Sequence, residues 1–155
     1  MENLLTEVSR LHFPRPPATP AQITAFEARM GWKLDEDLRA FYLHCNGATL
    51  FAPLPDVHYH MLPLERIERA RVAIRGNDRD AAGAASLYTL VDMQDSDFVV
   101  LDVARSESGR YPLFDAWHET FPELVPVASS FAEFLEKALR SGNRAFWLSS
   151  GPLEE

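Results

Sequence analysis

Four aspartates gather in one short stretch of the chain, where they offer negative charge to a basic partner. Asp92, Asp95 and Asp97 surround one polar segment, and Asp102 lies on the apolar run that follows. Their order does not match a calcium loop, which requires acidic residues at alternate positions, then a glycine and a distal glutamate. Two interpretations stay open: a solvated hairpin tip, or an electrostatic docking surface for a basic protein.

Tryptophan offers a second kind of contact with a partner. The chain has three tryptophans, at positions 32, 117 and 147. An exposed tryptophan is a frequent anchor of protein interfaces, whereas in a domain of this size it is more often part of the core. Trp117 joins the four aspartates as a candidate partner-binding residue.

Two histidines are the best candidates for metal binding. His58 and His60 take alternate positions in a short run that alternates with apolar residues, so on a strand both imidazoles point to one side and can chelate zinc. A third ligand is missing locally, and Glu65 or His44 supplies one only if the fold brings it close. We expect surface or hydrogen-bonded histidines, with no metal and no cofactor. A small metal-dependent hydrolase built on His58 and His60 stays as an alternative.

Cys45 beside His44 suggests a nucleophile and its base, but helix geometry argues against the pair. Adjacent helical residues point about 100° apart. Cys45 shares an apolar face with Leu38 and Tyr42, so we expect a buried core cysteine. The sequence contains no motif of a serine hydrolase, a zinc protease, a phosphate-binding loop or a dinucleotide-binding fold. We therefore expect no catalytic residue.

Composition favours one globular domain in a reducing compartment. The 155 residues are 46% hydrophobic and 25% charged, as in ordinary globular proteins. The net charge of -8 argues against binding nucleic acid through a basic face and favours a basic protein partner. The single cysteine, the absence of a signal-peptide pattern at the N-terminus and the lack of a membrane-spanning stretch indicate a cytoplasmic protein.

Helical patterns dominate the first third of the chain. An apolar stripe at residues 4, 5, 8 and 11 predicts a docking helix, which prolines 14, 16 and 17 end. Thr19 and Gln22 form a capping box with proline at the first helical position, and Gly31 ends that helix. Asp35 caps the next helix, which stops before Gly47 and leads into a short apolar strand.

Strand patterns follow. After a short helix over residues 64–74 and a surface loop at 76–84, β-rich runs at 87–93, 98–103 and 110–114 are joined by tight turns. Three such runs predict an antiparallel meander. Ser130 and Glu133 form a second capping box before the last main helix. The prediction is a single α+β domain with helices packed on one antiparallel β-sheet.

The segment GWKLDEDLRAFYLHCNGATLF, residues 31–51, resembles the signature of the SUKH superfamily, with its glycine, its DLRAFY-like helix and its NGA turn in this order. Three later segments fit the same family: LPLERI at 62–67, the acidic hairpin at 92–102, and VASSFAEFLEKAL at 127–139 as the closing helix. The resemblance spans residues 19–139. It implies a SUKH-like domain over 19–148, preceded by the docking helix and proline-rich linker at 1–18 and followed by a flexible tail at 149–155.

The resemblance also implies binding rather than catalysis. Bacterial SUKH proteins are known largely as immunity proteins that neutralise polymorphic or contact-dependent toxins, many of them nucleases. Eukaryotic relatives of the Smi/Knr type are regulatory interaction modules. The first hypothesis is therefore an immunity protein that occludes a basic toxin, and the alternative is a regulatory protein-interaction module.

Overall fold

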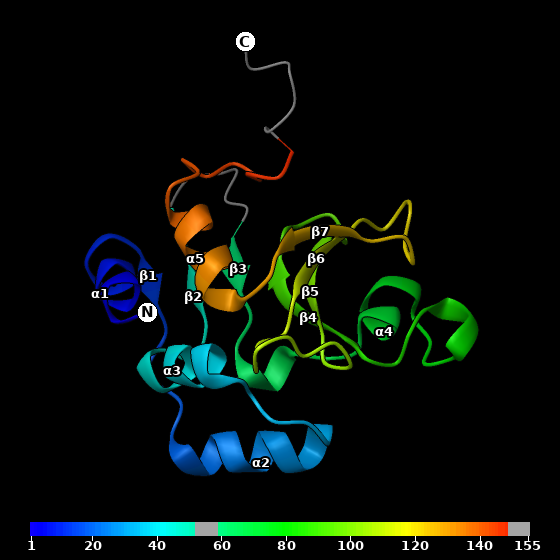
Figure 1. Ribbon diagram of the computed structural model, residues 1–155, viewed down its shortest axis with the longest axis horizontal. Helices are drawn as coiled ribbons and strands as arrows, with labels where there is room; N and C mark the ends of the chain where they lie inside the picture. Colours follow the sequence, from blue (N-terminus) through cyan, green and yellow to red (C-terminus); the bar gives the residue numbers. More distant parts are fainter. Residues whose placement is uncertain (52–58, 149–155) are drawn as a thin grey trace.

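The computed structural model describes residues 1–51 and 59–148. Within them, seven strands form one antiparallel meander, because each strand pairs with the strands that precede and follow it in sequence (Figure 1). Strands β1 and β7 are therefore the two edges. The strands are Phe13–Pro14 (β1), Ala48–Thr49 (β2), His60–Met61 (β3), Leu87–Asp92 (β4), Phe98–Asp102 (β5), Leu113–Ala116 (β6) and Val125–Ala128 (β7).

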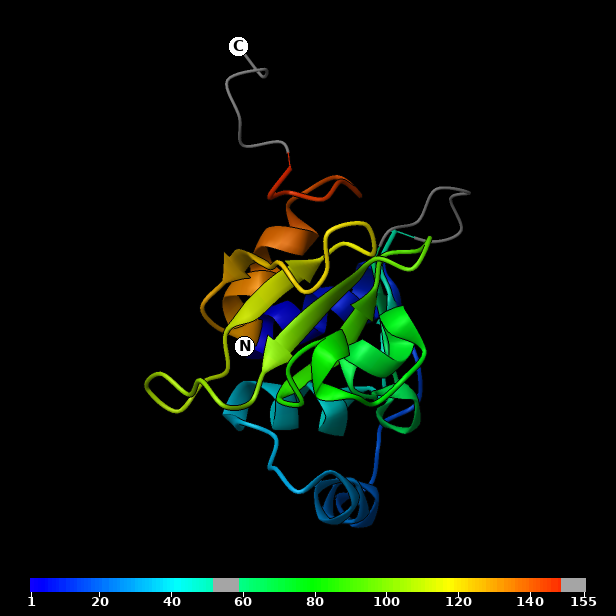
Figure 2. The ribbon, with the colours of Figure 1, turned by 90° about the vertical axis from the view of Figure 1, so that its right-hand side faces the viewer.

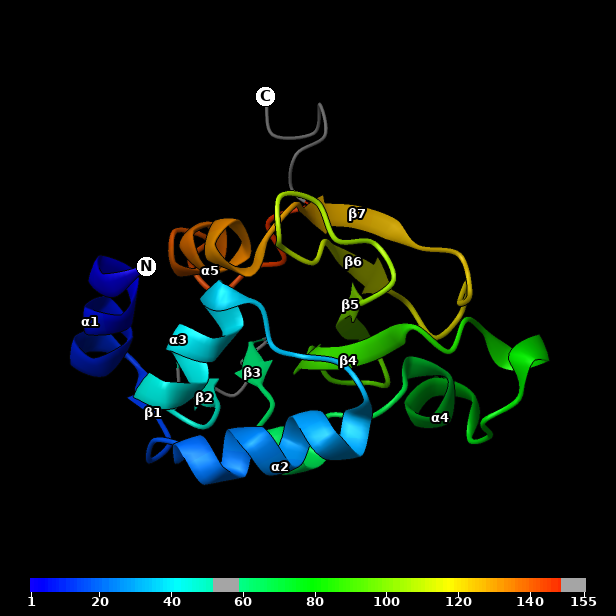
Figure 3. The same ribbon diagram turned by 60° about the horizontal axis from the view of Figure 1, so that its bottom comes forward.

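Five α-helices pack on this sheet in the described part of the chain, so the predicted single α+β domain is confirmed. They are Glu2–Leu11 (α1), Pro20–Met30 (α2), Glu36–His44 (α3), Ala70–Arg75 (α4) and Phe131–Leu139 (α5), with short 3-10 turns at Leu64–Arg66 and Asp80–Ala82. Figure 2 shows α4 in front of the sheet and α1 and α5 behind it, and Figure 3 shows that α3 runs at a steep angle to α2.

The alternation of side chains along the strands explains these two layers. On β5, Val99 and Leu101 face the main core, which α1, α2, α3 and α5 complete, whereas Val100 faces a smaller cluster with Ala70 of α4 and Phe121. Successive residues of a strand point to opposite faces, so a run of apolar residues requires cover on both sides. Strand β5 is buried from Val99 to Asp102.

The predicted helix caps are present. The Thr19 side chain accepts a hydrogen bond from the Gln22 backbone N–H, and the Gln22 side-chain oxygen accepts one from the Thr19 backbone N–H. Gly31 ends α2 in the left-handed conformation. The Asp35 carboxylate accepts from the Leu38 backbone at the start of α3. These local sequence signals correctly placed the helix starts because each cap satisfies backbone groups that the helix itself leaves free.

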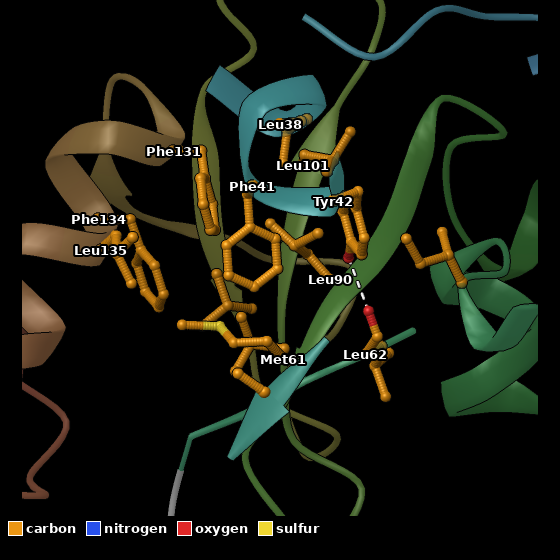
Figure 4. Packing of buried hydrophobic residues seen from close by; sticks show 14 of the residues in the cluster. Leu38, Phe41, Tyr42, Met61, Leu62, Leu90, Leu101, Phe131, Phe134 and Leu135 are labelled. Carbon is orange, nitrogen blue, oxygen red and sulfur yellow. Dashed lines mark hydrogen bonds between the residues drawn. The ribbon is translucent and has the colours of Figure 1, made fainter. Parts of the chain in front are cut away.

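The buried face of α3 is also as predicted. Leu38, Phe41, Tyr42 and Cys45 are each at most 1% exposed. Figure 4 shows Phe41 between the sheet and Phe131 of α5, and the Tyr42 hydroxyl donating a 2.6 Å hydrogen bond to the Leu62 carbonyl oxygen. The helix therefore joins the sheet and α5 in one core.

The strand expected over 110–114 is β6, Leu113–Ala116, which begins and ends later than predicted. Two further boundaries differ from the sequence prediction. The segment 127–139, expected as the closing helix, is not helical throughout, because Val125–Ala128 is strand β7. Helix α5 begins after Ser130, as the predicted cap indicates, and the Ser130 hydroxyl accepts from the Glu133 backbone. The capping box is incomplete, since the Glu133 carboxylate accepts from Ser129 instead of the Ser130 backbone. The helix expected over 64–74 is divided into a 3-10 turn and α4, because the backbone at residues 68 and 69 pairs with strand β4. In both cases a neighbouring strand outcompetes local helix preference.

The N-terminal segment packs on the rest of the chain. Leu5 and Val8 of α1 are buried, although Leu11 is 62% exposed and does not join the predicted stripe. Glu7 accepts two hydrogen bonds from the guanidinium of Arg140, at 2.7 and 3.0 Å. The linker after α1 contributes strand β1, with Pro14 on the sheet edge, where a missing N–H costs least.

Phe41→Ala should lower the free energy of unfolding by about 3–5 kcal/mol, because the lost ring leaves a cavity between the sheet and Phe131. Urea titration measures this change. Leu43→Ala is the control on the same helix, since Leu43 is 37% exposed, and it should cost under about 1 kcal/mol. Equal losses in the two variants would contradict the buried position of Phe41.

Candidate functional site

An open pocket of about 380 Å³ lies beside the hairpin that joins β4 to β5. Three parts of the chain form it: the hairpin, the end of β6 with the residue that follows, and the segment after α5. Its polar and aromatic lining comes from Asp95, Asp97, Asp115, Trp117, Arg144 and Trp147. The pocket thus combines carboxylates with two indole rings.

The hairpin tip has an unusual backbone. Gln94, Asp95 and Ser96 have φ angles of 76°, 57° and 66°. A residue other than glycine in the left-handed region raises the conformational free energy by about 1 kcal/mol or more, and here three such residues follow one another. Asp92 supports the turn, since its carboxylate accepts a 2.7 Å hydrogen bond from the Gln94 backbone. The tip therefore presents the exposed Asp95 side chain from a constrained turn.

Asp97 anchors the hairpin to the chain after β6. One oxygen of its carboxylate accepts a hydrogen bond from the His118 backbone N–H and lies 2.9 Å from the Nδ1 atom of the same residue. This contact positions the pocket wall, because Trp117 immediately precedes His118. The Trp117 side chain is 44% exposed, so the contact holds a large apolar surface next to the acidic tip.

Asp115 is the buried carboxylate of the pocket. It is 8% exposed, and its Oδ2 atom accepts a 2.9 Å hydrogen bond from the indole N–H of Trp147. Burial raises the pKa of this carboxyl; the Trp147 N–H opposes the rise and the negative charge of Asp97 adds to it. Within residues 1–51 and 59–148 no donor bonds to the Oδ1 atom. The pocket therefore holds a carboxylate with one oxygen bonded to Trp147 and the other still reached by solvent.

The structure brings only some of the predicted partner-binding residues together. Asp95, Asp97 and Trp117 line the pocket, and Asp92 lies at the base of the same hairpin. Asp102 is at the far end of β5, 7% exposed, where it accepts from the Ala104 backbone and contacts Arg105. The four aspartates therefore do not form one surface, because an extended strand separates Asp102 from the tip.

Sequence reasoning missed two parts of the pocket. Asp115 lies on a buried strand and Arg144 follows the last helix, so neither is near the hairpin in sequence. Trp147 belongs to the core and to the pocket, since its ring packs against Phe134 of α5 and the residue also lines the pocket. No local pattern marks these residues, since long-range packing alone brings them together.

Cys45, the candidate nucleophile, is inaccessible to a substrate. Cys45 is fully buried, and burial raises the pKa of its thiol to about 12. His44 does not point to it but lies 2.6 Å from the hydroxyl of Ser9 on α1. The expected core cysteine is confirmed.

The two histidines considered as metal ligands form no metal site within the described part of the chain. His58 lies outside the described residues. The ring of His60 is 3.2 Å from the side-chain nitrogen of Gln94 and 3.4 Å from the hydroxyl of Thr49. Residues 1–51 and 59–148 hold no group of three or more histidine, cysteine or acidic side chains placed to bind a metal ion.

Comparison with family models gives a match over most of the chain. The model of the SMI1 / KNR4 family (SUKH-1) matches residues 17–137. The chain belongs to this family. Membership is typical of immunity proteins in polymorphic toxin systems. A search of curated proteins found no significant match. The resemblance read from the SUKH-like segment at 31–51 is therefore confirmed.

The family match covers the hairpin and Trp117 but ends before Arg144 and Trp147. The pocket is thus built partly from the matched region and partly from the segment after α5. In the described part of the chain, every helix is too short or too polar to cross a membrane.

Asp115→Asn should make the protein more stable at pH 7. The raised pKa means that the folded state holds the proton more tightly than the unfolded chain, so stability falls as pH rises through the folded pKa and the carboxyl ionises. Asparagine keeps an acceptor for Trp147 without the charge. Urea titrations should give a gain at pH 7 that shrinks towards pH 4.

Asp95→Asn is the matched control, because it removes the same charge from an exposed position of the same pocket. It should change stability much less than Asp115→Asn. A loss of stability in Asp115→Asn at pH 7 would contradict the cost assigned to the buried charge.

Proposed function

We propose that this protein is a cytoplasmic immunity protein that binds a cognate toxin and blocks its active site, without turnover. The observation that supports it most is the pocket itself, which the exposed Trp117 lines together with residues of the acidic hairpin tip and the buried Asp115. Exposed aromatic side chains beside charged groups are typical anchors of protein interfaces.

Charge supports a basic toxin as the partner. The chain has a net charge of -8, and the hairpin places Asp92, Asp95 and Asp97 at one tip. A nuclease has a basic groove because its substrate is anionic, so an acidic inhibitor associates quickly with it and competes with the nucleic acid. We therefore propose a nuclease toxin whose groove receives the hairpin.

Replacing Asp92, Asp95 and Asp97 together with asparagine should slow association with the toxin about tenfold at low salt and weaken the salt dependence of the rate. The hydrogen bonds that these side chains accept are available to asparagine, so the fold should persist. Stopped-flow mixing with the toxin encoded by the neighbouring upstream gene measures the rate at low and high salt.

A second variant that loses the same number of charges elsewhere distinguishes the effect of the hairpin from the effect of net charge on the association rate. Glu36→Gln, Asp102→Asn and Glu107→Gln remove three charges at the opposite end of β5. This variant should associate nearly as fast as the parent. If both triple variants slow association equally, the hairpin is not the docking surface.

The proposed mechanism needs no metal. Purified protein should contain no stoichiometric metal by elemental analysis, and the double variant His58→Ala with His60→Ala should still neutralise the toxin in a growth assay. The reason is that a binder acts by occlusion, and no activated water is required. One equivalent of zinc in the parent that is absent from the double variant, together with lost protection, would support the hydrolase alternative instead.

A further inference from the structure

The pocket beside the hairpin has the composition of a site for a planar cation. Its two indole rings, those of Trp117 and Trp147, come from separate parts of the chain, and three carboxylates surround them. Indole faces attract cations, and a guanidinium group is planar, weakly hydrated and able to bond a carboxylate while it stacks on a ring. An ordinary surface hairpin requires no such combination.

Asp115 is the residue that makes this more than a group of surface charges. The residue is 8% exposed and lines the pocket, one oxygen accepts from the Trp147 N–H, and the other has no donor within the described residues and is still reached by solvent. An oxygen that has no donor in the described part of the protein and is still reached by solvent is available to a donor from a ligand. A charged N–H donor from outside satisfies this oxygen with a strong, charge-assisted hydrogen bond.

We propose that this pocket binds the guanidinium group of an arginine side chain that projects from the partner. The identity of the partner as a toxin rests on the proposed function, whereas the chemistry of the pocket does not. In this arrangement the guanidinium donates to Asp115 Oδ1 and lies against the exposed Trp117 ring, while Asp95 and Asp97 add attraction at the rim. A volume of about 380 Å³ accommodates one long side chain.

Arg144 allows a test of whether the pocket prefers a positively or a negatively charged ligand. Its side chain also lines the pocket, and in the described part of the chain it makes no ion pair within 4.0 Å. As a positive charge at the rim, Arg144 competes with an incoming cation but attracts an incoming anion. Removing it should therefore strengthen the binding of a cation and weaken the binding of an anion.

The experiment uses Nα-acetyl-arginine methylamide as the probe and the intact protein without any toxin. We expect the indole N–H resonances of Trp117 and Trp147 to shift on titration, with a dissociation constant of about 1 mM for a ligand of this size. Nα-acetyl-citrulline methylamide, which is neutral, should bind at least tenfold more weakly. The lysine analogue should also bind more weakly, because an ammonium group cannot stack.

Four variants complete the test. Asp115→Asn and Trp117→Ala should each weaken binding of the arginine probe about tenfold, and Arg144→Ala should strengthen it. Asp102→Asn, at the far end of β5, should leave it unchanged. Asparagine at position 115 retains the bond to Trp147, so folding is not in question.

Equal affinity for the citrulline probe, no shift of either indole, or weaker binding in Arg144→Ala would overturn the assignment. Preference for the lysine analogue would overturn the choice of a guanidinium. These results do not depend on a toxin, so they are independent of the neutralisation assays. A protein that binds the arginine probe but protects against no toxin would retain this site and lose the proposed function.

Discussion

The packing of α3 against the sheet is the constraint on which the rest of the structure depends. The Tyr42 hydroxyl is fully buried, and its 2.6 Å hydrogen bond to the Leu62 carbonyl oxygen fixes the helix relative to the chain after β3. A buried hydroxyl without a partner would be costly, so this contact permits little movement. At the start of the same helix, the two oxygens of Asp35 accept from the backbone of Leu38 and of Tyr111. One side chain thus caps α3 and ties it to the segment before β6.

The core positions the wall of the pocket through contacts made by α5. Phe41 of α3 packs edge-on against Phe131 with ring centres 5.0 Å apart, and Phe134, one turn further along α5, packs against Trp147. Trp147 then donates to Asp115 on β6. Close-packed aromatic rings transmit position because they have few alternative arrangements. The wall of the pocket is therefore fixed by the same core that stabilises the domain.

Two features that lower stability lie at this one place. The turn at residues 94–96 holds three residues in the left-handed region, and burial of Asp115 raises the pKa of its carboxyl. By contrast, helices α2, α3 and α5 begin with side-chain caps, as local preference predicts. Local departures from such preferences are expected where a surface is shaped for binding rather than for folding. Membership of a family typical of immunity proteins agrees with that interpretation.

The sequence by itself determined where α2 and α3 begin and that the central strands form a meander, because caps and apolar periodicity act between residues a few positions apart. Thr19 and Asp35 start their helices where predicted, and the acidic residues at 92–97 do form a hairpin tip. Only the tertiary structure decided which strands lie at the edges, that Asp102 is remote from the tip, and that Asp115 completes the pocket. Those outcomes depend on contacts between segments far apart in the chain, and no short-range pattern encodes such contacts.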